Sequence, residues 1–136
     1  MDLNSKLSEL SRLRFFVRKF WEAEAGFMHD ETGADALILA VNEAAANVIR
    51  HAFSGLSDRR FSVMAEAWPD RVVVELSHDG QGFPQKSAPA SLPPEPQDHG
   101  YGLYIIENCL DGVSYITDDQ GTQRIIMEKR PAPQPG

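Results

Sequence analysis

The 136-residue sequence is poor in cysteine, in long apolar runs and in basic charge. The single cysteine, Cys109, cannot form a disulfide within the chain, so we expect a reducing, cytoplasmic location. No apolar run approaches the ~18 residues that a membrane-spanning helix needs, so we expect no membrane association. Basic residues number 13 against 20 acidic ones, and the net charge of −7 argues against binding to nucleic acid phosphates.

The sequence has enough apolar residues to form one hydrophobic core. These residues make up 42% of a chain whose length is typical of a single domain. We therefore expect one domain over residues 1–130, followed by a disordered tail at 131–136.

Apolar spacing predicts a mixed order of helices and strands. Spacings of three and four predict helices, whereas strict alternation predicts strands. The predicted helices are 5–25, 32–52 and 103–110, and the predicted strands are 60–67, 71–77, 113–117 and 122–129. This order is typical of an α+β, two-layer sandwich, in which a mostly antiparallel sheet carries helices on one face.

The segment 83–99 is rich in proline and interrupts this pattern. It holds Pro84, Pro89, Pro93, Pro94 and Pro96. Neither a helix nor a central strand tolerates that spacing of prolines. A loop of this length in a compact domain is usually functional or disordered, and we interpret 83–99 as a lid.

The second predicted helix carries a row of polar side chains. Glu43 and Asn47 are four residues apart and lie one above the other, and Arg50 continues the row. A carboxylate can accept a proton, and an amide oxygen is a suitable ligand for Mg²⁺. Taken alone, however, the same residues also fit a solvated helix face with an ion pair.

Two glycine motifs occur farther along the chain. Gly80 and Gly82 directly follow a predicted strand, where they permit close approach of a ligand to the backbone. Gly100 and Gly102 open a predicted helix, whose free N–H groups would favour an anion such as a phosphate. An ordinary loop and a flexible hinge remain the alternatives for these two motifs.

In combination, these motifs resemble a known family. The order of an E-x-x-x-N helix, a Gly-x-Gly turn, a variable lid and a G-x-G-L helix start resembles the Bergerat-type (GHKL) ATP-binding fold of histidine kinases and gyrase. The stretches VNEAAANVIRHAF and GYGLYIIENCLDGVSY are most similar to the small anti-sigma factor serine kinases of bacteria. The resemblance covers residues 33–130.

The resemblance implies ATP and Mg²⁺ as cofactors and assigns a role to each motif. Glu43 would be the general base, Asn47 the magnesium ligand, and Arg50 a neighbour of the phosphates or lid. The other nucleotide-binding positions would be Gly80 and Gly82 beside adenine, Gly100, Tyr101, Gly102 and Leu103 around the phosphates, and Thr122 near the adenine.

One position departs from the family pattern. The family turn reads D-x-G-x-G, and its first Asp accepts a hydrogen bond from the adenine amino group. Here His78 occupies that position and Asp79 the next one, so both are candidate nucleotide contacts. A neutral imidazole can still accept this bond, whereas a protonated one cannot. Metal binding by His78 and Asp79 with Asp98 and His99 is an alternative, but no tight ligand spacing supports it.

Three functions follow as hypotheses. The first is an ATP-dependent kinase that phosphorylates a serine on a STAS-type anti-anti-sigma partner, sequesters a sigma factor and forms a homodimer, as the resemblance implies. The second is a partner-switching module of the same fold with weak or lost nucleotide binding. The third is a detached ATPase domain that works beside a response-regulator phosphatase.

Overall fold

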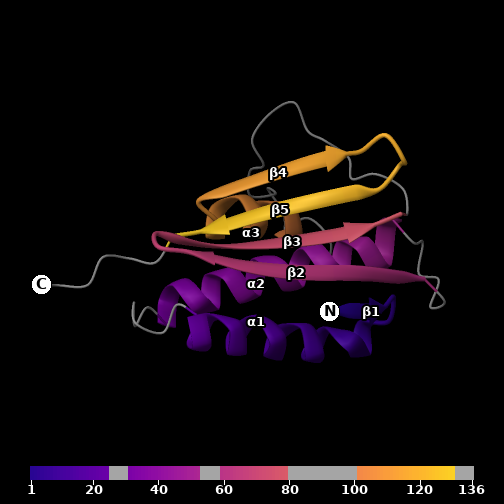
Figure 1. Ribbon diagram of the computed structural model, residues 1–136. Helices are drawn as coiled ribbons and strands as arrows, with labels where there is room; N and C mark the ends of the chain where they lie inside the picture. The colour runs from indigo at the N-terminus through magenta and orange to yellow at the C-terminus, as the bar shows by residue number, and fades with distance from the viewer. Residues whose placement is uncertain (25–30, 53–58, 80–100, 131–136) are drawn as a thin grey trace, which may run out of the picture.

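The computed structural model in Figure 1 describes residues 1–24, 31–52, 59–79 and 101–130. Side chains at 51–52 and 101–104 are outside this description. In chain order the elements are β1 (Asp2–Asn4), a 3₁₀ turn η1 (Leu7–Glu9), α1 (Leu10–Glu24), α2 (Glu31–Asn47), a π-helical turn η3 (Val48–Ala52), β2 (Arg60–Trp68), β3 (Arg71–His78), α3 (Tyr101–Cys109), β4 (Gly112–Thr117) and β5 (Gln123–Lys129).

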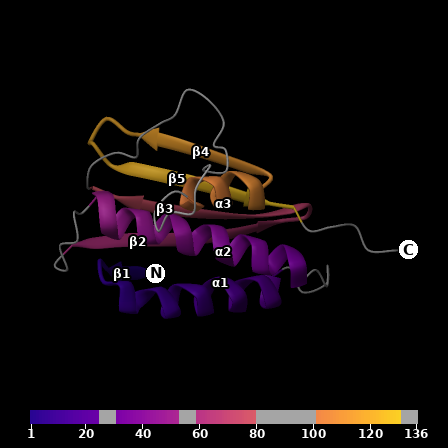
Figure 2. The same ribbon diagram turned by 180° about the vertical axis from the view of Figure 1, so that it is seen from behind.

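The strands form one antiparallel sheet in the order β1-β2-β3-β5-β4. All three helices lie on the same face of this sheet (Figures 1 and 2), and α2 packs between α1 and α3. The predicted α+β, two-layer sandwich is therefore confirmed. β3 is the central strand, so its end is enclosed by neighbours on both sides.

The hydrophobic core fills the space between the sheet and the helices. On β3 the side chains of Val72, Val74 and Leu76 are buried against the helix layer, while the intervening residues face the open side of the sheet. Helix α1 buries one stripe at helical spacing, made up of Leu10, Leu13, Val17 and Trp21. These periodicities are the ones that the sequence predicted.

The N-terminal residues differ from the prediction. Helix α1 begins at Leu10 rather than near residue 5, because Asp2–Asn4 first forms β1 along the edge of β2. The N-terminal ammonium of Met1 donates a 2.9 Å hydrogen bond to the carbonyl of Val63. A strand this short carries too little alternation to be distinguished from a loop in the sequence.

The other element boundaries differ less from the predicted ones, and the structure does not test two predicted segments. Helix α3 begins at Tyr101, two residues earlier than predicted. The lid assigned to 83–99 and the tail assigned to 131–136 lie outside the described residues.

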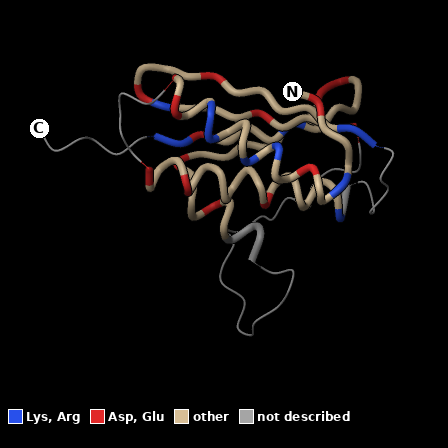
Figure 3. Tube along the Cα trace, turned by 90° about the horizontal axis from the view of Figure 1, so that it is seen from below, with Lys and Arg blue, Asp and Glu red and all other residues tan. Residues whose placement is uncertain are grey.

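None of the described helices combines the length and apolar character needed to cross a bilayer. Figure 3 shows acidic and basic positions interspersed along the described chain.

Candidate functional site

Helix α2 presents a polar side opposite its buried side. Glu43 and Asn47 are half-buried and one turn apart, whereas Arg50 is exposed. The opposite side holds Leu37, Val41, Ala45 and Val48, none of which is exposed. The core therefore fixes the rotation of α2 about its axis, and this rotation determines where the carboxylate and the amide lie.

Two polar contacts from α1 help to hold α2 in place. Arg14 Nη1 donates to Asn42 Oδ1 at 2.8 Å, next to Glu43 in the chain. Arg18 Nη2 lies 2.6 Å from Asp35 Oδ1, and this hydrogen bond raises the pKa of Arg18 above its ordinary value. Both pairs are exposed, so each contributes little to stability.

The geometry of the helix changes immediately after Asn47. Residues Val48–Ala52 form a π-helical turn, in which each residue rotates less about the axis than in an α-helix. The angle about the helix axis between Asn47 and Arg50 therefore differs from the one that ideal α-helical spacing gives. Arg50 lies on an exposed part of the turn. π-Turns are frequent at functional sites.

His78 ends β3 with its side chain on the helix side of the sheet. It is only 4% exposed, and it lies between Phe61 of β2 and Gln123 of β5. Burial lowers the pKa of His78, and the nearby charge of Asp79 opposes this shift only in part. The imidazole is therefore neutral at pH 7 and has one acceptor nitrogen and one donor nitrogen.

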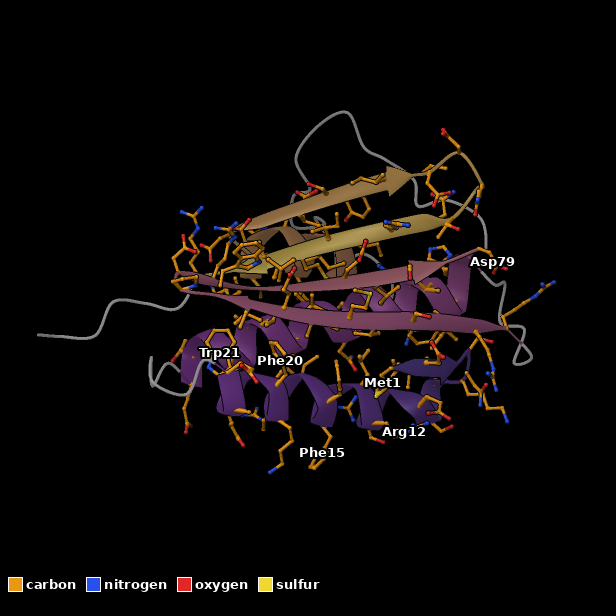
Figure 4. The ribbon with its side chains drawn as sticks, viewed as in Figure 1. Met1, Arg12, Phe15, Phe20, Trp21 and Asp79 are labelled. Atoms are coloured by element: carbon orange, nitrogen blue, oxygen red, sulfur yellow. The ribbon has the colours of Figure 1, made fainter. Side chains whose placement is uncertain are left out.

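Asp79 follows at the end of the strand, and its side chain is exposed. Figure 4 shows it beyond the end of β3, at the margin of the sheet. The two residues that the sequence left as competing nucleotide contacts therefore have opposite environments: the histidine is inside and the carboxylate is outside.

Thr122 is held at the same end of the sheet by the β4–β5 turn. Asp118 Oδ1 accepts hydrogen bonds from the N–H groups of Gln120 and Thr122, each at 2.9 Å. Gly121 adopts a positive φ of 83°, which favours glycine. The residue after Thr122, Gln123, is the register partner of His78. Sequence reasoning missed Asp118 and Gln123, although Asp at the start of a turn was a signal for Asp118.

The structure brings the C-terminal end of α2 and the end of β3 to the same end of the molecule. They lie together in both views (Figures 1 and 2). Tyr101, Gly102 and Leu103 form the first turn of α3, which packs against α2. Gly80, Gly82 and Gly100 lie outside the described residues.

The oxygen atoms of the Glu43 and Asn47 side chains suit a magnesium–nucleotide complex better than a metal ion bound by protein side chains alone. No group of three His, Cys, Asp or Glu residues in the described ranges is arranged to hold a metal ion. Asp98 and His99, which the alternative metal site requires, fall outside those ranges. Glu43 and Asn47 together offer hard oxygen atoms, and Mg²⁺ takes one or two such ligands with phosphates and water. The residues present thus fit Mg²⁺ bound with a nucleotide.

Comparison with known proteins places the chain in a family. The model of the histidine kinase-like ATPase domain matches residues 3–129, and the chain belongs to this family. It is 28% identical over 105 residues to the serine-protein kinase RsbW of Listeria innocua, covering 71% of this chain and 66% of that kinase. Over 96 residues it is 28% identical to RsbW of Bacillus subtilis, covering 65% of this chain and 59% of that kinase. The chain thus spans somewhat less than two thirds of each relative.

Solved structures agree with this fold. The RsbU and RsbW domains of Rv1364c from Mycobacterium tuberculosis align with all of this chain and 34% of that one, with a TM-score of 0.61 and 16% identity. The histidine kinase domain of the blue-light activated kinase from Erythrobacter litoralis covers 74% of this chain and 45% of that one, with a TM-score of 0.55 and 16% identity. At these identities the structures support the fold alone.

Proposed function

We propose that the chain is a serine protein kinase of the anti-sigma type. In this proposal it transfers a phosphoryl group from ATP to a serine of a STAS-type anti-anti-sigma partner, and it sequesters a sigma factor. The main observation behind this proposal is that Glu43 and Asn47 are half-buried on the polar side of α2. They lie at the end of the molecule where β3 ends in the buried His78. The similarity to two named serine-protein kinases supports the same function.

The polar side chains of α2 supply the chemistry near the phosphates. Bound Mg·ATP provides the phosphoryl group, whose transfer requires mainly positioning and charge neutralisation. Asn47 holds the magnesium ion through its side-chain oxygen, and Glu43 accepts the proton of the attacking serine hydroxyl. Arg50 adds positive charge near the phosphates. The N–H groups at the start of α3, with Gly100, Tyr101, Gly102 and Leu103, cradle the phosphates.

The end of the sheet recognises the base. His78 accepts a hydrogen bond from the adenine amino group through the acceptor nitrogen of its neutral imidazole. Gly80 and Gly82 would allow the adenine to approach the backbone, and Asp79 and Thr122 would lie near the base. A neutral acceptor replaces a carboxylate here, so we expect ATP to bind roughly ten- to a hundredfold more weakly than with Asp at position 78.

A phosphorylation assay tests the proposal. The purified protein, the cognate STAS protein and labelled Mg·ATP are mixed, and phosphoserine on the partner is measured. Glu43→Gln should lower the phosphorylation rate by about 10²- to 10⁴-fold, because the general base is lost. The matched control is Glu66→Gln, which removes an exposed carboxylate from β2 and should leave the rate unchanged. Partner binding without any phosphate transfer would contradict the kinase proposal.

The buried His78 favours a second candidate, in which the fold binds its partners but has little affinity for nucleotide. Calorimetric titration with Mg·ATP distinguishes the two. We expect His78→Asp to tighten ATP binding by roughly ten- to a hundredfold and His78→Asn, which keeps a neutral acceptor, to change it much less. Micromolar affinity in the unchanged protein would contradict the second candidate.

Homodimer formation and a cytoplasmic location belong to the same proposal. The oligomeric state can be measured by light scattering over a range of protein concentrations. If the protein is a monomer at all concentrations, the proposed homodimer is wrong. The proposed phosphoryl transfer would not be affected by that result.

A further inference from the structure

β2 has an edge that β1 covers only in part. β1 pairs with the first residues of β2, and the last backbone hydrogen bonds between them join Met1 to Val63, at 2.8 and 2.9 Å. Because strand residues two apart point the same way, the N–H and C=O groups of Ala65 and Ala67 also point away from β3. Within the described ranges, no strand pairs with this part of β2 on that side.

A groove runs beside this open edge. It has a volume of about 580 Å³ and is lined by Met1, Ser11, Arg12, Phe15, Phe16, Lys19 and Phe20. Figure 4 shows Phe20 between α1 and β2, with Met1 farther along the same space. Phe15 stands at the outer margin and is 64% exposed. Aromatic side chains of α1 thus form an apolar wall next to unused backbone donors and acceptors.

The β2 residues at the open edge have small side chains on the helix side of the sheet. Ala65 and Ala67 lie on the helix side of the sheet and are half-buried, although their positions continue the series of the buried residues Phe61 and Val63. Side chains from an added strand, placed opposite these alanines, would point into the groove.

Two basic side chains lie at the margin of the groove, each with a carboxylate nearby. Arg12 and Lys19 lie on the exposed side of α1, about two turns apart, and both side chains are about 60% exposed. Arg12 Nη1 is 2.7 Å from Glu9 Oε2, whereas Lys19 Nζ is 3.8 Å from Glu22 Oε2 and 5.3 Å from the ring centre of Phe15. Positive charge at the edge of an apolar groove is complementary to an acidic, apolar segment.

We propose that the open edge of β2 binds an extended segment of a partner protein, which adds antiparallel to β2 as a further strand. The segment carries apolar side chains opposite Ala65 and Ala67, and a carboxylate beside Arg12 or Lys19. Backbone hydrogen bonds provide affinity, and the aromatic groove selects the side chains, as in other strand additions. This surface is separate from the nucleotide site, and the inference does not depend on kinase activity.

A second copy of the chain fits this edge less well. Symmetric pairing of two β2 edges through both alanines would place Glu66 opposite Glu66, and like charges directly opposite each other are destabilising. It would also bring two copies of the same pair of basic side chains onto one groove.

A synthetic peptide tests the proposal. The probe is acetylated, amidated Asp-Thr-Val-Thr-Val-Thr-Asp, whose valines face the groove when the peptide pairs with β2. We expect the amides of Ala65 and Ala67 to exchange rapidly with deuterium in the free protein and to become protected when the peptide is added. The amides of Met64 and Glu66, which point toward β3, should be protected throughout.

Two controls separate strand addition from nonspecific apolar binding. N-methylation of both valines removes the N–H groups that face β2 and should weaken binding by at least roughly tenfold. Lys19→Glu should also weaken binding, whereas Arg60→Glu, which reverses an exposed charge at the start of β2, should not. Neither substitution removes a buried side chain, so both proteins should fold.

Three results would overturn the proposal. The first is the absence of protection at millimolar peptide, and the second is equal binding by the N-methylated peptide. The third is protection of Ala65 and Ala67 without peptide that increases with protein concentration, because a second copy would then be the occupant.

Discussion

At the scale of single residues, His78 has the most unusual environment in the described chain. It is a titratable side chain at the end of the central strand, almost fully buried, between Phe61 and Gln123. A protonated imidazole in that position would carry charge out of water, which is why burial lowers the pKa of His78. The same neutrality that would let His78 accept a hydrogen bond from a nucleotide base, as proposed, also links folding to pH.

We therefore predict that acidification destabilises the protein through His78. The unfolded histidine has a pKa of about 6.5, and the folded one is lower, so the unfolded state binds more protons between these two values. The free energy of unfolding should fall as the pH drops below about 6.5, until the folded pKa is reached. Urea unfolding at pH 7.5 and 5.5 should show a smaller decrease for His78→Gln. Identical decreases in both proteins would contradict the prediction.

At the scale of elements, the β4–β5 turn shows how one side chain can position a residue of the candidate site. Asp118 accepts two backbone hydrogen bonds, including the one from Thr122, and its other oxygen lies 3.5 Å from Arg124 Nη2. The turn thereby sets where β5 begins, and β5 places Gln123 beside His78. Its neighbour Asp119 is exposed.

These contacts predict different effects for two adjacent aspartates. Asp118→Ala should lower the free energy of unfolding by about 1–2 kcal/mol, because two backbone N–H groups lose their acceptor. Asp119→Ala should change it by less than about 0.5 kcal/mol. The urea midpoints of the two variants provide the measurement, and equal midpoints would contradict the assigned role of Asp118.

Sequence patterns predicted the long elements and missed the short or irregular ones. The stripe of α1 and the alternation of β3 reflect burial on one side, which hydrophobic periodicity records directly. β1 was not predicted because its pairing with β2 depends on contacts between residues about sixty positions apart. The π-turn after Asn47 was not predicted because its residues are equally compatible with an α-helix.

The candidate site could be predicted in its residue types but not in its geometry. The spacing of Glu43 and Asn47 was sufficient to place them on one helix face. No local pattern showed that the side chain of His78 points inward while Asp79 is exposed, because that depends on where β3 ends. Gln123 could be paired with His78 only through the order of the strands.

At the scale of the whole molecule, the three helices cover one face of the sheet, and no other described element covers the opposite face. Leu76 lies fully buried under the helices, whereas Met64, one strand away and on the opposite face, is 63% exposed. The contribution of an apolar side chain to the free energy of unfolding therefore depends on which face of the sheet it lies on, as well as on its size.

We predict that truncating these two residues has unequal effects. Leu76→Ala should lower the free energy of unfolding by about 2–5 kcal/mol, because it leaves a cavity in the core. Met64→Ala should lower it by less than about 0.5 kcal/mol, since little apolar area is buried there. Chemical denaturation of both variants measures the difference, and similar losses would show that the open face is covered in solution.

Helix α2 also has a consequence for how such a protein can diverge. Its hidden side is packed through small side chains, and Ala40, Ala44 and Ala45 have no exposed surface. Larger residues there would force apart the sheet and the neighbouring helices. The residues facing the candidate site are free of that constraint, so a lineage can alter or abandon its chemistry at Glu43 and Asn47 while the alanines stay fixed. Inactive descendants of this domain should therefore keep the alanines after the polar pair has been lost.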